Sequence, residues 1–93
     1  MKNLVIFGSG QHSKVVVDEI NRLKKFNLLG YLSNQDKKKH SLKKVKFLGN
    51  IKNIKNINYK NYFGIIAVGQ GNIREKIIKE IKNLKIKIKW EKI

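Results

Sequence analysis

The sequence predicts an α/β fold, with a mostly parallel sheet of four to five strands in a small three-layer domain. Short apolar runs of strand character alternate along the chain with stretches whose apolar residues recur at helical spacing. That alternation produces parallel strands joined by right-handed helical crossovers. The two most apolar runs each pass directly into a glycine-rich turn and a helix, so we expect them at the centre of the sheet. The 93 residues are expected to form one domain.

The first expected elements are a strand at residues 4–7 and a helix at residues 12–25. The strand is a continuous apolar run, L-V-I-F, which is typical of a strand covered on both faces. The helix carries an apolar stripe at helical spacing, with charged residues turned outward. The stripe consists of Val15, Val16, Val17, Ile20 and Leu23.

The middle of the chain has weaker patterns. A second strand is expected at residues 27–32, and a polar, lysine-rich loop at residues 33–41 follows it. Residues 45–48 alternate as V-K-F-L, which favours a short third strand ended by Gly49. Residues 50–58 place isoleucine at every third position. This spacing favours a short helix, although low-complexity drift would produce the same pattern.

The last third of the chain repeats the order of strand, glycine turn and helix. Residues 62–68 are the second strongly apolar strand, and residues 69–71 are the second glycine turn. An amphipathic helix follows this turn. Its apolar stripe consists of Ile73, Ile77, Ile78, Ile81 and Leu84. Ile86, Ile88 and Trp90 then alternate with lysines, which is typical of a half-buried edge strand.

The composition excludes several classes of protein. The chain has no cysteine, so it holds neither a disulfide framework nor a thiolate metal site, in keeping with a reducing compartment. Its first apolar stretch is four residues long and ends at Gly8, which is too short for a signal peptide or a membrane span. We therefore expect a cytoplasmic protein that has no membrane partner.

The formal net charge of +16 raises the alternative of a small basic nucleic-acid-binding protein. Nearly all of that charge is lysine, because Arg22 and Arg74 are the only arginines. A nucleic-acid surface usually includes arginine and exposed aromatic rings, whereas Phe7, Phe63 and Trp90 fall inside strand-like runs. A general bias toward lysine, isoleucine and asparagine explains the charge equally well. We expect salt-sensitive adhesion to polyanions but no specific nucleic-acid partner.

The two glycine turns predict a phosphate site. Residues 8–13 and residues 69–72 follow the two central strands, and ligands of doubly wound sheets bind beyond the carboxyl ends of such strands. Each turn opens a helix, whose N-terminus presents unpaired N–H groups and the positive end of the helix dipole. Two such N-termini at one cleft suit a diphosphate. With Ser13 in place of a third glycine, the first turn matches the dinucleotide-binding pattern G-x-G-x-x-G imperfectly.

Polar side chains near these turns are candidates for ligand contacts. Ser9 and Ser13 are expected either to donate hydroxyls to phosphate or to cap a helix. His12 is expected to contact phosphate or sugar, or else to be structural, and Arg74 to clamp an anion or face solvent. We expect no catalytic residue and no metal site, since His40 is the only other histidine. The full set of substrate- or nucleotide-binding candidates is Gly8, Ser9, Gly10, His12, Ser13, Lys14, Ser33, Asn34, Gly69, Gln70 and Arg74.

A dinucleotide-binding module for NAD or FAD is the second alternative. In that fold an acidic residue after the second strand binds the ribose hydroxyls. Here Ser33 and Asn34 stand at that place, and the nearest carboxylate belongs to Asp36. This departure disfavours a nicotinamide or flavin cofactor.

Four segments resemble one family of bacterial enzymes. The run F-G-S-G-Q-H-S-K-V-V-V-D at residues 7–18 resembles the G-x-G-G-H-x-K-V-V-x-D opening of the PglD/NeuD-type sugar acetyltransferases. Y-L-S at residues 31–33, F-L-G-N at residues 47–50 and I-I-A-V-G-Q-G-N-I-R at residues 65–74 are similar to that family's later segments, in the same order. The resemblance spans essentially the whole chain.

In such proteins this segment is the N-terminal domain, a small Rossmann-like unit that binds the nucleotide-sugar acceptor. The resemblance therefore implies a UDP- or CMP-sugar, or a free sugar, as the ligand of the candidate residues. Gln11 stands where a glycine is usual, and the Y-L-S form is similar to the sialic-acid-modifying branch. These departures leave cytidine and a free sugar open beside uridine.

The second part of such enzymes is a left-handed β-helix, which forms the trimer, binds acetyl-CoA and carries the catalytic histidine. The present sequence stops about where that part would begin and contains no hexapeptide repeat. The resemblance thus implies a nucleotide-sugar-binding domain that is not catalytic by itself and holds no cofactor. It also implies a separate β-helix acetyltransferase subunit as partner; otherwise the chain is a fragment or a repurposed binding domain.

Overall fold

The structure is a computed structural model that describes residues 1–92, and its four strands form one parallel sheet in the order β2-β1-β3-β4. The strands are β1 (Lys2–Phe7), β2 (Phe26–Leu32), β3 (Phe63–Ile66) and β4 (Lys89–Trp90). The two most apolar runs of the sequence, in β1 and β3, are neighbours at the centre of the sheet, as predicted. The α/β class and the parallel sheet are both confirmed.

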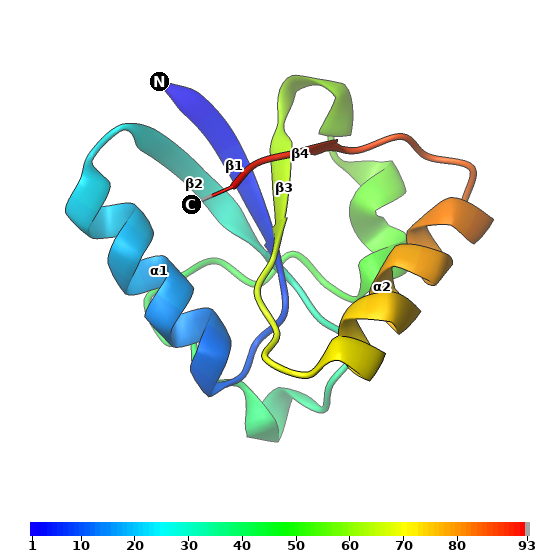
Figure 1. The fold of residues 1–93 in the computed structure, drawn as a ribbon, viewed down its shortest axis with the longest axis horizontal. Helices are drawn as coiled ribbons and strands as arrows, with labels where there is room; N and C mark the ends of the chain where they lie inside the picture. The colour runs from blue at the N-terminus through cyan, green and yellow to red at the C-terminus, as the bar shows by residue number, and fades with distance from the viewer. Residues whose placement is uncertain (93) are drawn as a thin grey trace.

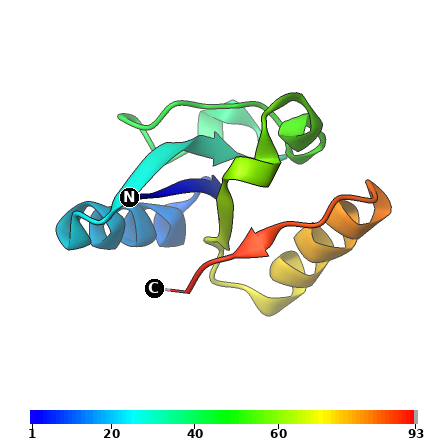
Figure 2. The same cartoon turned by 90° about the horizontal axis from the view of Figure 1, so that it is seen from above.

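Two long helices cover opposite faces of this sheet (Figures 1 and 2). They are α1 (Gln11–Leu23) and α2 (Gly71–Asn83). Because side chains alternate along a strand, β1 contributes to both cores: Leu4 and Ile6 pack with α1, and Val5 and Phe7 pack with α2. Within residues 1–92, neither helix has the length and apolar content needed to cross a membrane.

The expected short helix at residues 50–58 forms the 3-10 helix η2 (Ile51–Asn56). Ile51 and Ile54 are buried and Ile57 is half-buried. A 3-10 helix has three residues per turn, so the spacing places Ile51 and Ile54 on one face, and Ile57, the residue after the helix, packs beside them. That face packs on the same core as α2. Two shorter 3-10 helices, η1 (Lys37–Lys39) and η3 (Tyr59–Asn61), lie on either side of η2 in the sequence.

The third strand expected at residues 45–48 is not formed. Only Phe47 makes a parallel bridge, to Tyr31 of β2, and the Tyr31 N–H donates to the Lys46 carbonyl over 2.9 Å. Gly49 follows with a φ of 110°, a conformation that takes the chain out of the extended direction. The segment still runs beside β2, because the Leu48 N–H donates to the Tyr31 carbonyl and the Ser33 N–H donates to the Gly49 carbonyl, over 2.8 and 3.0 Å, but these bonds form no regular strand ladder.

Other expected elements differ at their edges. The strand predicted at residues 62–68 is limited to β3, and β4 consists of two residues. β4 is the edge strand, as predicted, and the Trp90 side chain is 44% exposed, with its ring 5.7 Å from the Phe7 ring, centroid to centroid. Val15, expected in the apolar stripe of the first helix, is 63% exposed. The fully buried residues of α1 are Ser13, Val17 and Ile20, while Val16 and Leu23 of the predicted stripe are partly buried, so Val15 is the stripe residue that faces solvent.

Candidate functional site

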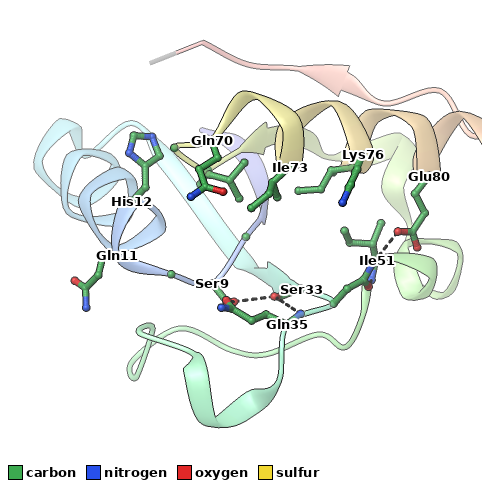
Figure 3. A pocket seen from close by; sticks show the side chains of 17 residues that line it. Ser9, Gln11, His12, Ser33, Gln35, Ile51, Gln70, Ile73, Lys76 and Glu80 are labelled. Carbon is green, nitrogen blue, oxygen red and sulfur yellow. Dashed lines mark hydrogen bonds between the residues drawn. The ribbon is translucent and has the colours of Figure 1, made fainter.

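A cavity of about 300 Å³ lies between the two glycine turns (Figure 3). Its lining residues come from the turn after β1, the loop after β2, the turn after β3, η2 and one face of α2. Both helices begin at the same end of the sheet, the lower end in Figure 1, where β1 and β3 finish. The two glycine turns therefore share one cavity at the carboxyl ends of the central strands.

The first glycine turn depends on Gly8. Its φ is 134°, and a Cβ atom added there would lie 2.7 Å from both the Ala67 carbonyl oxygen and the Ser13 hydroxyl. Only glycine fits at that position. Gly10 differs, because a Cβ atom added there would have no neighbour within 4 Å. The backbone at Gly10 is thus open to a ligand that approaches from the cavity.

Both helix N-termini at the cavity lack a side-chain cap. Gly10 is the N-cap of α1 and Gln70 is the N-cap of α2, and neither first turn contains an acidic residue. The first helical hydrogen bonds run from the Lys14 N–H to the Gly10 carbonyl and from the Arg74 N–H to the Gln70 carbonyl, over 3.2 and 3.0 Å. The N–H groups before them have no partner within their own helices. Two positive dipole ends therefore converge on one space.

A cluster of hydroxyl and amide groups forms the wall beside the first turn. The hydroxyls of Ser9 and Ser33 lie 2.7 Å apart, and the Ser9 hydroxyl donates to the Gln35 side-chain carbonyl over 3.0 Å. The Gln35 N–H donates to the Ser33 hydroxyl over 3.1 Å. Both serines are buried, so this arrangement is fixed from within the protein.

One face of α2 forms the opposite wall. Its lining residues are Ile73, Lys76, Ile77 and Glu80. The Glu80 carboxylate accepts from the Asn34 side-chain amide over 2.7 Å, and the Asn34 side-chain carbonyl accepts from the Ile51 N–H over 2.9 Å. This bond pair ties the loop after β2 to both α2 and η2. The wall is thus apolar near the turn and charged at its far end.

Most of the candidates predicted from sequence line the cavity. They are Gly8, Ser9, Gly10, His12, Ser33, Asn34, Gly69 and Gln70. His12 is exposed and close to the second turn, since a Cβ atom added at Gly69 would lie 3.8 Å from the His12 Cβ. In Figure 3 its ring stands at the mouth of the cavity. Neither Ser9 nor Ser13 caps a helix by its side chain.

Three candidates do not line the cavity. The Ser13 hydroxyl is fully buried and donates to the Ala67 carbonyl over 2.5 Å, so it joins α1 to the end of β3. Lys14 borders a separate groove beside α1. The Arg74 guanidinium donates to the Ile66 carbonyl over 3.3 Å. Successive helical residues turn by about 100°, so neighbours in a first turn face different surroundings.

Sequence reasoning missed other lining residues. Gln35 follows the two predicted residues of its loop directly. Lys76 and Glu80 share the helix face of Ile73, at spacings of three and four residues, and this spacing was the available signal. Because the chain has so many lysines, charged side chains on a helix are expected to face solvent. Lys76 and Glu80 were therefore not predicted to line the cavity.

Comparison with known proteins identifies the family of the chain. The model of the PglD N-terminal domain family matches residues 3–81. The chain belongs to the PglD N-terminal domain family. The resemblance of its four sequence segments to the N-terminal domain of sugar acetyltransferases is thereby confirmed.

A solved structure shares the fold of this PglD N-terminal domain. It is the acetyltransferase domain of PglB from Neisseria gonorrhoeae FA1090 in complex with acetyl coenzyme A, with 22% sequence identity and a TM-score of 0.68. The similarity covers 92% of this chain and 41% of that chain. The present chain therefore spans less than half the length of that domain. A search of curated proteins found no match.

Proposed function

We propose that this PglD N-terminal domain binds a nucleotide sugar, with UDP- and CMP-sugars as the leading ligands, and that it is not catalytic by itself. The observation that carries the proposal is the opening of two uncapped helix N-termini into one cavity. Backbone N–H groups and helix dipoles at one point favour a phosphate or diphosphate. The cavity volume lies at the lower end of the range for small-molecule sites, about 300–1,000 Å³.

The other walls suit the rest of such a ligand. The Ser9, Ser33 and Gln35 cluster offers hydroxyl and amide groups to ribose or sugar hydroxyls. Ile51 and Ile73 supply apolar surface for a ring. These features support a ligand that is anionic at one end and rich in hydroxyls or rings at the other.

A nicotinamide or flavin cofactor is less compatible with the same site. The loop after β2 supplies serine and amide groups where the cofactor's ribose needs a carboxylate. The Glu80 carboxylate comes from α2 instead and is engaged with Asn34. Acetyl-CoA belongs, in our proposal, to a separate β-helix acetyltransferase part with which this domain acts.

Calorimetric titration of the domain tests this proposal. UDP-N-acetylglucosamine, a CMP-sugar and NAD⁺ are compared at physiological salt. Saturable heat from at least one nucleotide sugar, and none from NAD⁺, is the expected result. If every nucleotide sugar gives only dilution heat, the proposed function is wrong.

The contribution of His12 gives a sharper test with a matched control. His12→Ala removes the ring at the cavity mouth and is expected to weaken nucleotide-sugar binding about 10-fold, the effect of one hydrogen bond to a charged group. Lys14 lies in the same helical turn but does not line the cavity. The Lys14→Ala variant should therefore bind the nucleotide sugar as tightly as the unmodified domain does. Equal losses in the two variants would argue for general charge attraction instead.

A further inference from the structure

The cavity wall at residues 33–35 is anchored by a histidine that does not line the cavity. After β2 the chain passes through Gln35 and η1 and returns at Ser41, whose N–H donates to the Ser9 carbonyl over 2.7 Å. His40 precedes that return and is half-buried. Its position in a lysine-rich loop gave no reason to expect a role.

Both ring nitrogens of His40 have partners. Nε2 lies 2.9 Å from the Gln35 carbonyl oxygen, and Nδ1 lies 3.0 Å from the Tyr31 hydroxyl. A carbonyl only accepts, so in the neutral ring Nε2 carries the proton, Nδ1 accepts and the Tyr31 hydroxyl donates. The ring also packs edge-on against Tyr31 and Phe47, with centroids 5.4 and 4.9 Å away. Tyr31 is 3% exposed, so β2 holds His40 in one orientation.

Gln35 transmits this constraint to the cavity. It lies between β2 and η1, outside regular secondary structure, so its orientation depends on side-chain hydrogen bonds. His40 holds its backbone carbonyl, while its own side chain and N–H bind Ser9 and Ser33. A chain of hydrogen bonds therefore runs from the buried Tyr31 hydroxyl through His40 and Gln35 to the first glycine turn.

We propose that His40 is a positioning residue for ligand binding: it fixes the Gln35 peptide and thereby the Ser9, Ser33 and Gln35 cluster that receives the hydroxyl-bearing part of the ligand. This inference rests on the proposed function, because it names what holds that part of the same site in place. Loss of the His40 hydrogen bonds releases the wall while both helix N-termini remain intact.

Two substitutions separate hydrogen bonding from packing. His40→Phe keeps an aromatic ring between Tyr31 and Phe47 but removes both hydrogen bonds. His40→Gln keeps one donor and one acceptor in a side chain of similar reach. Lys39→Gln, an exposed neighbour in η1, is the control for changes in the loop itself and should behave as the unmodified domain.

The first measurement needs no ligand. In amide NMR spectra, His40→Phe is expected to shift the resonances of Ser9, Ser33 and Gln35 and to leave those of Gly69 and Gln70 in place. In the unmodified domain, the nitrogen chemical shifts of the His40 ring should be those of the neutral form that carries its proton on Nε2. Unchanged resonances along the wall in a folded His40→Phe variant would overturn the inference.

The second measurement is titration with UDP-N-acetylglucosamine. His40→Phe should bind about 3- to 10-fold more weakly, the weight of a net hydrogen bond, and His40→Gln should recover much of that loss. Equal weakening in the two variants would mean that ring packing matters and would overturn the inference. If the unmodified domain binds no nucleotide sugar, the proposed function fails and the NMR result alone decides the role of His40. If His40→Phe does not fold, Tyr31→Phe takes its place in both measurements. It keeps both rings and removes only the hydrogen bond that orients His40, so smaller changes in the same resonances are expected, and unchanged wall resonances would overturn the inference.

Discussion

Gly8 and Gly10 lie two residues apart in the first turn and meet different demands. Gly8 has a φ of 134° and no room for a Cβ atom beside the Ala67 carbonyl, whereas Gly10 has an ordinary backbone and open space. The first glycine is therefore required by the fold, and the second leaves room for a ligand. These two requirements can be measured separately.

Gly8→Ala is expected to destabilise the domain by about 1–3 kcal/mol, the cost of forcing a side chain into a sparsely populated backbone region. The added contact with the Ala67 carbonyl oxygen increases this cost. Urea denaturation of the variant beside Gly10→Ala is the measurement. Equal stabilities of the two variants would contradict the assignment of the strain to Gly8.

Gly10→Ala should weaken nucleotide-sugar binding at least several-fold and change the free energy of unfolding little, because the added methyl group occupies space in the cavity. Gly71→Ala is the matched control, since a Cβ atom there also meets nothing within 4 Å but Gly71 does not line the cavity. Calorimetric titration of both variants checks this. If Gly10→Ala and Gly71→Ala bind the nucleotide sugar equally well, the ligand does not approach the Gly10 backbone and the prediction is wrong.

Burial raises the pKa of the Tyr31 hydroxyl above its ordinary value. A raised pKa in the folded state means that the stabilising contribution is complete below about pH 10, the unfolded value, and is lost as pH rises through the folded-state pKa. Tyr31→Phe removes this loss. Unfolding free energies of both proteins at about pH 8 and pH 11 should therefore converge at the higher pH; a constant difference between them would contradict the burial effect.

At the scale of single residues, the glycine turns and their serines were predictable because the order of strand, turn and helix fixes where they meet. The hydrogen bonds of Ser13 and Arg74 to main-chain carbonyls were not, because they depend on which way one helical turn faces. Gln35 and His40 become neighbours only when η1 folds the lysine-rich loop back.

At the scale of elements, η2 shows how a repetitive sequence acquires a defined structure. Ile51 and Ile54 are 2% and 1% exposed and join the core under α2. The three-residue spacing predicted a helix correctly but not its 3-10 form. Residues 45–48 differ: their alternation predicted a strand, but their hydrogen bonds to the segment of β2 form only one bridge and no regular ladder.

Ile54→Ala is expected to cost about 2–5 kcal/mol of stability, the range for emptying a buried isoleucine site. Ile57→Ala, at the residue after η2 and half-buried, should cost clearly less. Denaturant unfolding of the two variants tests whether η2 is an integral part of the core. Small and similar losses of stability in the two variants would show that the isoleucine side chains of this segment do not pack in the core.

At the scale of the whole molecule, the order β2-β1-β3-β4 brings the two strongest sequence signals together. Apolar runs identified the central strands, and their parallel pairing then required that both glycine turns lie at the same end of the sheet. Sequence alone therefore predicted the place of the cavity. The far wall, formed by α2 and η2, depends on packing between segments distant in sequence.

The net charge of +16 is also a property of the whole molecule. Duplex DNA should bind with an affinity that falls steeply with salt and is indifferent to sequence, because phosphate contacts dominate such binding. Nucleotide-sugar binding should respond much less to salt. Fluorescence anisotropy across a salt series measures both, and sequence-dependent DNA binding that persists at physiological salt would favour the nucleic-acid alternative.

An amide NMR titration of the domain with UDP- and CMP-sugars shows directly whether both helix N-termini take part in binding. We expect the resonances of both glycine turns, residues 8–12 and 69–71, to shift together along one saturable curve. Shifts confined to the lysine-bordered groove beside α1, or to one turn alone, would contradict the claim that two helix N-termini hold one phosphorylated ligand.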